Sequence, residues 1–290
     1  MRDLSIRFIK RTGRHDGRSL LMAGALALVL GAVAAPVALA KQVVNHEFDE
    51  FADCPITVKK LADCIAGTVD GGEFKVGSKT VIINKPITLQ GGIMNNSETL
   101  IPPPDGNTLS KTPLTVPGGL VGIEGLGGEV TATTELVGPV LLNTHNLFTH
   151  EGIAAQLPIR VKLSNPLLGN ECYIGSSLEP ITLRLTTGTT DPPAPNTPIT
   201  GSSGTLKVTA EGTIATVEGI SLVDNSFASP GVNGCGEGAS FLLDPLVNLS
   251  AGLPSTAGHN TAIMDQSVSE SAPKYVKKSH VIPKPPKNPA

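Results

Sequence analysis

Hydrophobic and polar residues alternate along much of the chain, a pattern typical of half-buried β-strands. The clearest case is the segment 157–169. Its residues Ile159, Val161 and Leu163 face one way, and the basic residues between them face the other. Segment 129–138 has the same period of two, and the other expected strands are 72–77, 79–84, 85–92, 172–175, 180–190, 204–223 and 241–250. The pattern predicts an all-β fold, an antiparallel β-sandwich or barrel-like domain of about ten short strands.

Two stretches interrupt the expected strands. Residues 93–119 contain the turn-forming runs PPPDG and VPGG, which predict a long loop. A division there into two packed β subdomains is an alternative to one domain. Residues 41–67 are polar, with Phe48 and Phe51 as anchors beside the first cysteine. Helical periodicity of any length occurs only near the N-terminus, and 32 Gly and 24 Pro among 290 residues argue against a helical bundle.

The first forty residues have the order of a secretory signal peptide. A basic stretch ends at Arg18, an apolar run of about 14 residues follows, and Ala38-Leu39-Ala40 supplies the small residues that a signal peptidase needs. The run is shorter than the roughly 20 residues that cross a bilayer, so we expect cleavage after Ala40 and no remaining membrane anchor. The mature protein, 41–290, is then expected to be secreted, either extracellular or associated with the cell wall.

Export would place the four cysteines in an oxidising compartment, where disulfides are the default. Of three possible pairings, Cys54 with Cys64 and Cys172 with Cys235 closes the smallest loops. A regular helix over 55–65 would put Cys54 and Cys64 about 15 Å apart, far beyond the roughly 4.4–6.8 Å between the Cα atoms of a disulfide. The pairing therefore requires a loop or a broken turn there. The absence of C-x2-C and H-x3-H spacings argues against a zinc site.

Charge divides the mature chain into an acidic body and a basic tail. Residues 41–271 carry 11 basic and 23 acidic side chains, a net charge of −12. The tail, 272–290, has five prolines, no acidic residue and five lysines, which are Lys274, Lys277, Lys278, Lys284 and Lys287. We expect a disordered tail whose lysines contact an anionic cell-wall polymer or lipid head groups. The alternative is a tail that binds nothing or folds back on the acidic body.

Candidate catalytic chemistry is sparse. His145, His150 and Glu151 lie close together in sequence, and His259 is the other conspicuous histidine. The spacing H-x4-H-E differs from the H-E-x-x-H of zinc proteases, and no G-x-S-x-G occurs. With no Trp and few other aromatic residues, the chain also lacks the usual platforms for sugars. We keep the four residues as a candidate polar site and expect no catalytic, metal or cofactor site and no nucleic-acid partner.

Several segments together resemble a group of exported, β-rich proteins from high-GC Gram-positive bacteria. They cover most of residues 50–262 and are KPITLQGG (85–92), PLTVPGG (113–119), VKLSNPLLGNECYIGS (161–176), LRLTTGTTDPPAPNTPI (183–199), LVDNSFASPGVNGCG (222–236) and GLPSTAGHNTA (252–262). Cysteines recur in that group in the contexts of all four cysteines of this chain. The resemblance implies export and disulfides, and it implies no catalytic residue.

Three functions are consistent with these features. The favoured hypothesis is a non-catalytic structural or interaction protein of the cell envelope or extracellular space. The alternatives are a secreted hydrolase whose site is assembled from separated loops, and a carrier of an apolar small molecule. A buried polar pocket holding His145 or His259 with a carboxylate would indicate the hydrolase, and a closed apolar cavity of several hundred Å³ would indicate the carrier.

Overall fold

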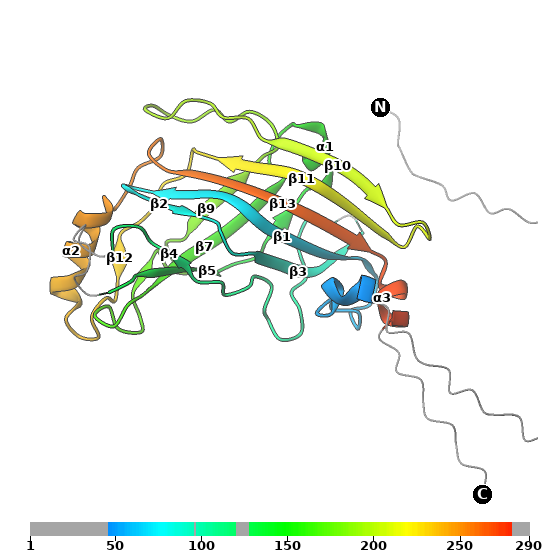
Figure 1. Ribbon diagram of the computed structural model, residues 1–290, viewed down its shortest axis with the longest axis horizontal. Coiled ribbons are helices and arrows are strands. Elements are labelled where there is room, and N and C mark those ends of the chain that lie inside the picture. The colour runs from blue at the N-terminus through cyan, green and yellow to red at the C-terminus, as the bar shows by residue number, and fades with distance from the viewer. Residues whose placement is uncertain (1–45, 96, 120–127, 280–290) are drawn as a thin grey trace, which may run out of the picture. The chain divides into compact units, whose positions relative to one another are not determined.

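Two antiparallel β-sheets packed face to face form the body of the protein (Figure 1). The structure is a computed structural model and describes residues 46–95, 97–119 and 128–279. These residues contain thirteen strands, which confirms the predicted all-β sandwich. The predicted signal peptide, its cleavage site, Lys284 and Lys287 lie outside the described residues.

The first sheet has six strands in the order β10-β11-β13-β1-β2, and β3 also pairs with β1. Their bounds are Leu61–Val76 (β1), Lys79–Ile82 (β2), Ile87–Met94 (β3), Ser202–Val208 (β10), Ile214–Asp224 (β11) and Thr261–Ser271 (β13). The register of β1 against β13 shifts between Val69 and Gly71. Next to this bulge, Gly72 has a φ of 100°, and a Cβ there would overlap the carbonyl oxygen of Ile263. The bulge separates the part of β1 that pairs with β3 from the part that pairs with β2.

The second sheet has seven strands in the order β12-β8-β7-β5-β4, with β6 and β9 pairing with β7. Their bounds are Leu114–Thr115 (β4), Thr131–Leu136 (β5), Leu141–Leu142 (β6), Ala155–Ser164 (β7), Tyr173–Ile174 (β8), Ile181–Leu185 (β9) and Val232–Asn233 (β12). Every second residue of β7 is buried, including Ile159, Val161 and Leu163, as the alternation predicts. The main core joins the two sheets and contains residues from both sides of 93–119, such as Ile65 and Ile181.

Four short helices complete the described residues: the 3-10 helix η1 (His46–Phe51) and the α-helices α1 (Thr144–Thr149), α2 (Ser240–Ala251) and α3 (Pro273–Ser279). Helix α2 replaces the strand expected at 241–250, so that prediction is wrong. The inward-facing residues Leu243, Val247 and Ala251 are spaced four apart, which is a helical period. Gly252 ends the helix in a left-handed conformation, and its region donates backbone hydrogen bonds to Asn248 and Leu249.

Helix α3 corrects the prediction that the tail is disordered from residue 272 onwards. Pro273 begins the helix, a position where proline is tolerated because a backbone N–H there would make no hydrogen bond within the helix. Val276 is only 1% exposed and packs with Phe48 and Phe51 in a second, smaller core. The helix therefore forms because an apolar side chain of the tail packs against the N-terminal segment. Both phenylalanines anchor that segment, as expected.

Both predicted disulfides are present. The Cα atoms are 5.5 Å apart in Cys54–Cys64 and 4.1 Å apart in Cys172–Cys235. Turns, rather than a helix, connect Cys54 to the start of β1, which meets the geometric condition for the first pair. The first disulfide belongs to the small core beneath α3. The second lies next to α2, because the backbone N–H of Cys235 donates to Asp244 of that helix at 2.9 Å.

Candidate functional site

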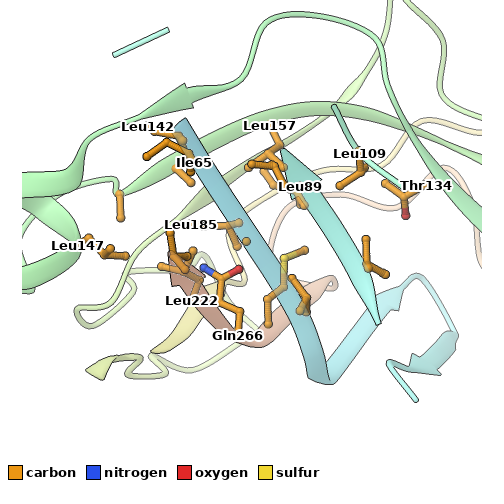
Figure 2. A pocket seen from close by; sticks show the side chains of 18 of the residues that line it. Ile65, Leu89, Leu109, Thr134, Leu142, Leu147, Leu157, Leu185, Leu222 and Gln266 are labelled. Atoms are coloured by element: carbon orange, nitrogen blue, oxygen red, sulfur yellow. The ribbon is translucent and has the colours of Figure 1, made fainter. Parts of the chain in front are cut away.

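An apolar cavity of about 170 Å³ lies between the inner faces of the two sheets. The first sheet contributes Ile65, Gly67, Val69, Leu89, Val217, Leu222, Met264 and Val268, and the second contributes Leu114, Ala132, Leu157, Ile159, Val161, Leu183 and Leu185. Figure 2 shows labelled side chains from both sheets gathered around this space. Protein interiors rarely leave voids larger than a water molecule, and this cavity is about ten times the volume of roughly 15 Å³ that a water needs.

Small residues on facing strands leave this space open. Gly67 of β1, Ala132 of β5, Ala155 of β7 and Ala215 of β11 all line the cavity. A Cβ at Gly67 would meet no atom closer than 3.7 Å, and its backbone conformation is open to any residue. Period-two alternation turns these small residues inward together with the large ones, so the two sheets meet around a gap.

The cavity reaches the surface between α1 and β10. Phe148 of α1 and Leu206 of β10 both line it, although they are 48% and 57% exposed. Helix α1 is held at this opening at its N-terminus, where the side chain of Asn143 accepts a hydrogen bond from the N–H of Asn146. The open side gives a small molecule a route to the apolar interior.

His150 holds the other end of α1. It caps the helix in a left-handed conformation with a φ of 60°. Its Nδ1 donates to the carbonyl oxygen of Thr187 at 3.2 Å, and its Nε2 lies 3.1 Å from Oγ of Ser203 in β10. The histidine thus connects both elements that border the opening, which is a structural role.

None of the four residues of the predicted polar site lines the cavity. His145 lies on the exposed side of α1, and Glu151 is exposed just after it. His259 is exposed in the loop that precedes β13. In the part of the chain that the structure describes, no group of three or more His, Cys, Asp or Glu side chains could hold a metal ion.

Strand β13 supplies polar groups to the cavity, in addition to Thr134, Asn143 and Thr144 from other elements. Its inner face carries Gln266 and Glu270, with Val268 between them. Although the side chain of Glu270 reaches solvent, the surrounding protein desolvates its carboxyl group and raises its pKa, and the negative charge of Asp63 raises it further. Desolvation also raises the pKa of Asp63 on β1. One end of a largely apolar cavity therefore carries the carboxyl group of Glu270, with that of Asp63 near it.

Sequence reasoning missed this end because no strand is expected at 261–271. The inward positions of β13 include Gln266 and Glu270, so the segment lacks the apolar alternation that marks a strand. Of the five lysines predicted to contact an anionic surface, three lie in the described residues. Lys274, Lys277 and Lys278 are exposed on α3. Lys274 Nζ lies 4.6 Å from the centre of the Tyr275 ring.

Within the described ranges, no helix is long and apolar enough to cross a membrane. Comparison of the chain with family models, with curated proteins and with solved structures yields no match. The function must therefore be argued from the cavity and the surfaces around it.

Proposed function

We propose that the protein binds an apolar small molecule in the cavity between its sheets and acts as a carrier of that molecule. The apolar cavity itself carries the proposal, because a void of this size destabilises a core unless something fills it. Cavities of about 150 Å³ with aliphatic walls accept ligands the size of benzene. The carrier hypothesis thus moves ahead of the structural or interaction protein that the sequence alone favours.

The cavity differs from the closed space of several hundred Å³ expected to indicate a carrier. At about 170 Å³ it is smaller, and it is open beside Phe148 and Leu206. The volume suits a slim ligand, such as an acyl segment or a single ring, and excludes a bulky fused-ring system. The opening lets the remainder of a longer molecule stay outside.

The acidic end of the cavity selects among slim ligands. Glu270 lines the cavity and Asp63 lies near enough to raise the pKa of Glu270, so a bound carboxylate would be repelled. A neutral alcohol or a cationic amine would instead donate a hydrogen bond to the carboxyl group of Glu270. We therefore expect an amphiphile with an alcohol or amine head to bind more tightly than the fatty acid of equal chain length.

Export fits this role. Two disulfides are stable in an oxidising compartment, and the predicted signal peptide would lead there. A secreted or cell-wall-associated carrier could use Lys274, Lys277 and Lys278 for attraction to anionic polymers or head groups. A hydrolase is less well supported, because His145 and His259 are both exposed.

Titration with the neutral, rod-shaped fluorophore 1,6-diphenylhexatriene, which contains no fused rings, tests the proposal. The wild-type protein should enhance its fluorescence saturably, and fatty alcohols should displace it. Gly67→Val should weaken this binding at least about tenfold, because the added methyl groups enter the cavity.

Thr68→Val is the matched control for that variant. Thr68 is the next residue of β1, its side chain faces away from the cavity, and valine has nearly the same shape as threonine. Equal binding by wild type and Gly67→Val, with Thr68→Val also unchanged, would refute the cavity as the binding site.

A further inference from the structure

Helix α2 (Ser240–Ala251) presents a continuous apolar face to the outside. Four of the ten exposed large hydrophobic side chains in the described residues lie on this helix, namely Phe241 (74% exposed), Leu242 (57%), Leu246 (51%) and Leu249 (82%). Leu242, Leu246 and Leu249 follow one another at spacings of four and three residues, so they lie on one side of the helix. Pro245 is also exposed among them.

No charge interrupts this face. Asp244, the one charged residue of the helix, points inward and accepts hydrogen bonds from the backbone N–H groups of Gly234 (3.2 Å) and Cys235 (2.9 Å). Asn248 is also turned toward the body, where it accepts from the N–H of Val232 at 2.8 Å. Asp244 and Asn248 thus attach the helix to the protein, and its outer face carries no charged side chain.

Apolar residues also lie on the inner side of α2, next to Asp244 and Asn248, and pack against one end of the sandwich. Val247 and Ala251 are buried and line a small void of about 60 Å³. Phe74 and Val161 line both this void and the main cavity, so the two spaces are neighbours. A surface helix normally turns its apolar residues toward the core and its polar residues toward water, so the second, exposed apolar face of α2 indicates contact with something outside the protein.

The size of the outer face of α2 distinguishes between a protein partner and a lipid phase. A helix of 12 residues is about 18 Å long and roughly 10 Å wide. Four exposed side chains on one short helix supply only part of the roughly 800 Å² of accessible surface that each partner buries in a stable protein interface, so a second copy of the chain bound through this face alone is disfavoured. A hydrocarbon phase requires no minimum area, and helices with exposed Phe and Leu insert at the boundary between head groups and acyl chains.

We infer that α2 is a lipid-contact helix, whose outer face inserts into the surface of a bilayer or lipid aggregate. This inference goes beyond the proposed ligand binding and stands without it. Insertion through Phe241, Leu242, Leu246 and Leu249 requires neither anionic lipid nor low salt. It is thus distinct from any attraction between lysines of α3 and anionic head groups, which salt would screen.

Flotation with vesicles of pure phosphatidylcholine at high salt tests the inference on the mature, oxidised protein. The wild type should float with the vesicles. Phe241→Gln/Leu249→Gln should reduce the bound fraction by about tenfold or more, because both changes replace inserted apolar groups. Glutamine keeps the net charge and the helix propensity, so neither can explain a loss.

Leu178→Gln/Val208→Gln is the matched control, since these residues are also exposed (92% and 56%) but lie outside α2. It should float like the wild type. Failure of the wild type to float, or equal loss in both double variants, would overturn the inference. So would a wild-type dimer that Phe241→Gln/Leu249→Gln converts to a monomer, because α2 would then be a contact between copies.

A fluorescent reporter tests the same contact without removing the apolar face. The chain contains no tryptophan, so Leu249→Trp introduces a single indole on α2. On vesicle addition its emission should shift to the blue and be quenched by brominated phosphatidylcholine, whereas Leu178→Trp should show neither effect. Because no apolar ligand is involved, a negative result would overturn the lipid contact and leave ligand binding untouched.

Discussion

Helices α2 and α3 both pack on the sandwich beside a disulfide. Helix α3 buries its aliphatic side chain, whereas α2 exposes most of its large apolar side chains. In α3, Val276 is 1% exposed and Lys274, Lys277 and Lys278 point outward. In α2, four large apolar residues, Phe241, Leu242, Leu246 and Leu249, are exposed, and the one charged residue is turned inward. Helix α3 therefore has the ordinary distribution of a surface helix, whereas α2 has apolar residues on its outer side as well as its inner side. The difference indicates that α3 is complete as it stands, whereas α2 is built to meet a hydrophobic phase.

The disulfide next to each helix provides the largest test of this comparison. Cys172–Cys235, beside α2, spans 63 residues, and Cys54–Cys64, beneath α3, spans 10. In the loop-entropy model the longer loop stabilises by about 4 kcal/mol and the shorter by about 3 kcal/mol. Urea unfolding of Cys172→Ala/Cys235→Ala and Cys54→Ala/Cys64→Ala should show this order. A reversed order would mean that local packing under α3, and not loop length, sets the stability.

Truncation of one side chain on each helix should separate a packed residue from an unpacked one. Val276→Ala leaves a gap against Phe48 and Phe51, and we expect a loss of about 2 kcal/mol in the free energy of unfolding. Leu246→Ala removes an exposed side chain and should change it by less than about 0.5 kcal/mol. Both are measured by urea unfolding in the absence of lipid. A large loss in Leu246→Ala would show that the outer face of α2 is already packed against the protein.

The two helices also show where sequence reasoning succeeds and where it stops. The period of two in 157–169 identifies β7 because Ile159, Val161 and Leu163 all face one core. The run at 241–250 has no such period, and a short apolar run suits a strand as well as a helix. What decides for α2 is its attachment through Asp244 to the loop of Cys235, which is distant from any local pattern. Val276 becomes helical for a similar reason, through contact with residues more than two hundred positions earlier.

The cavity was beyond sequence reasoning for a related physical reason. Gly67 and Ala155 are unremarkable alone, and they create space only because β1 and β7 face each other across the sandwich. The acidic end was hidden by the inward polar residues of β13, which remove its strand signature. The disulfide pairing, by contrast, could be predicted, because loop length ranks the pairings without knowledge of tertiary contacts.

The smallest expected effect concerns pH and the acidic groups near α3. Desolvation raises the pKa of Glu50, Asp63 and Glu270, and for Glu270 the neighbouring Asp63 adds to it. A carboxyl group whose pKa is raised by folding favours the folded state below the ordinary glutamate pKa, and this contribution is lost as the pH rises through the raised value. Removal of the Glu270 charge should therefore stabilise the folded protein near neutral pH and leave its stability unchanged in acid.

Glu270→Gln should accordingly raise Tm by about 1–2 °C near pH 7 and leave it unchanged at about pH 4, where the wild-type carboxyl is largely protonated. Solvent access to Glu270 keeps the effect small. Glu211→Gln, on the exposed turn between β10 and β11, removes one charge from the same acidic body and serves as the control. Thermal unfolding of the three proteins at both pH values measures the difference. An equal rise in both variants would assign the effect to net charge, and a fall in Glu270→Gln near pH 7 would mean that its carboxylate has a stabilising partner.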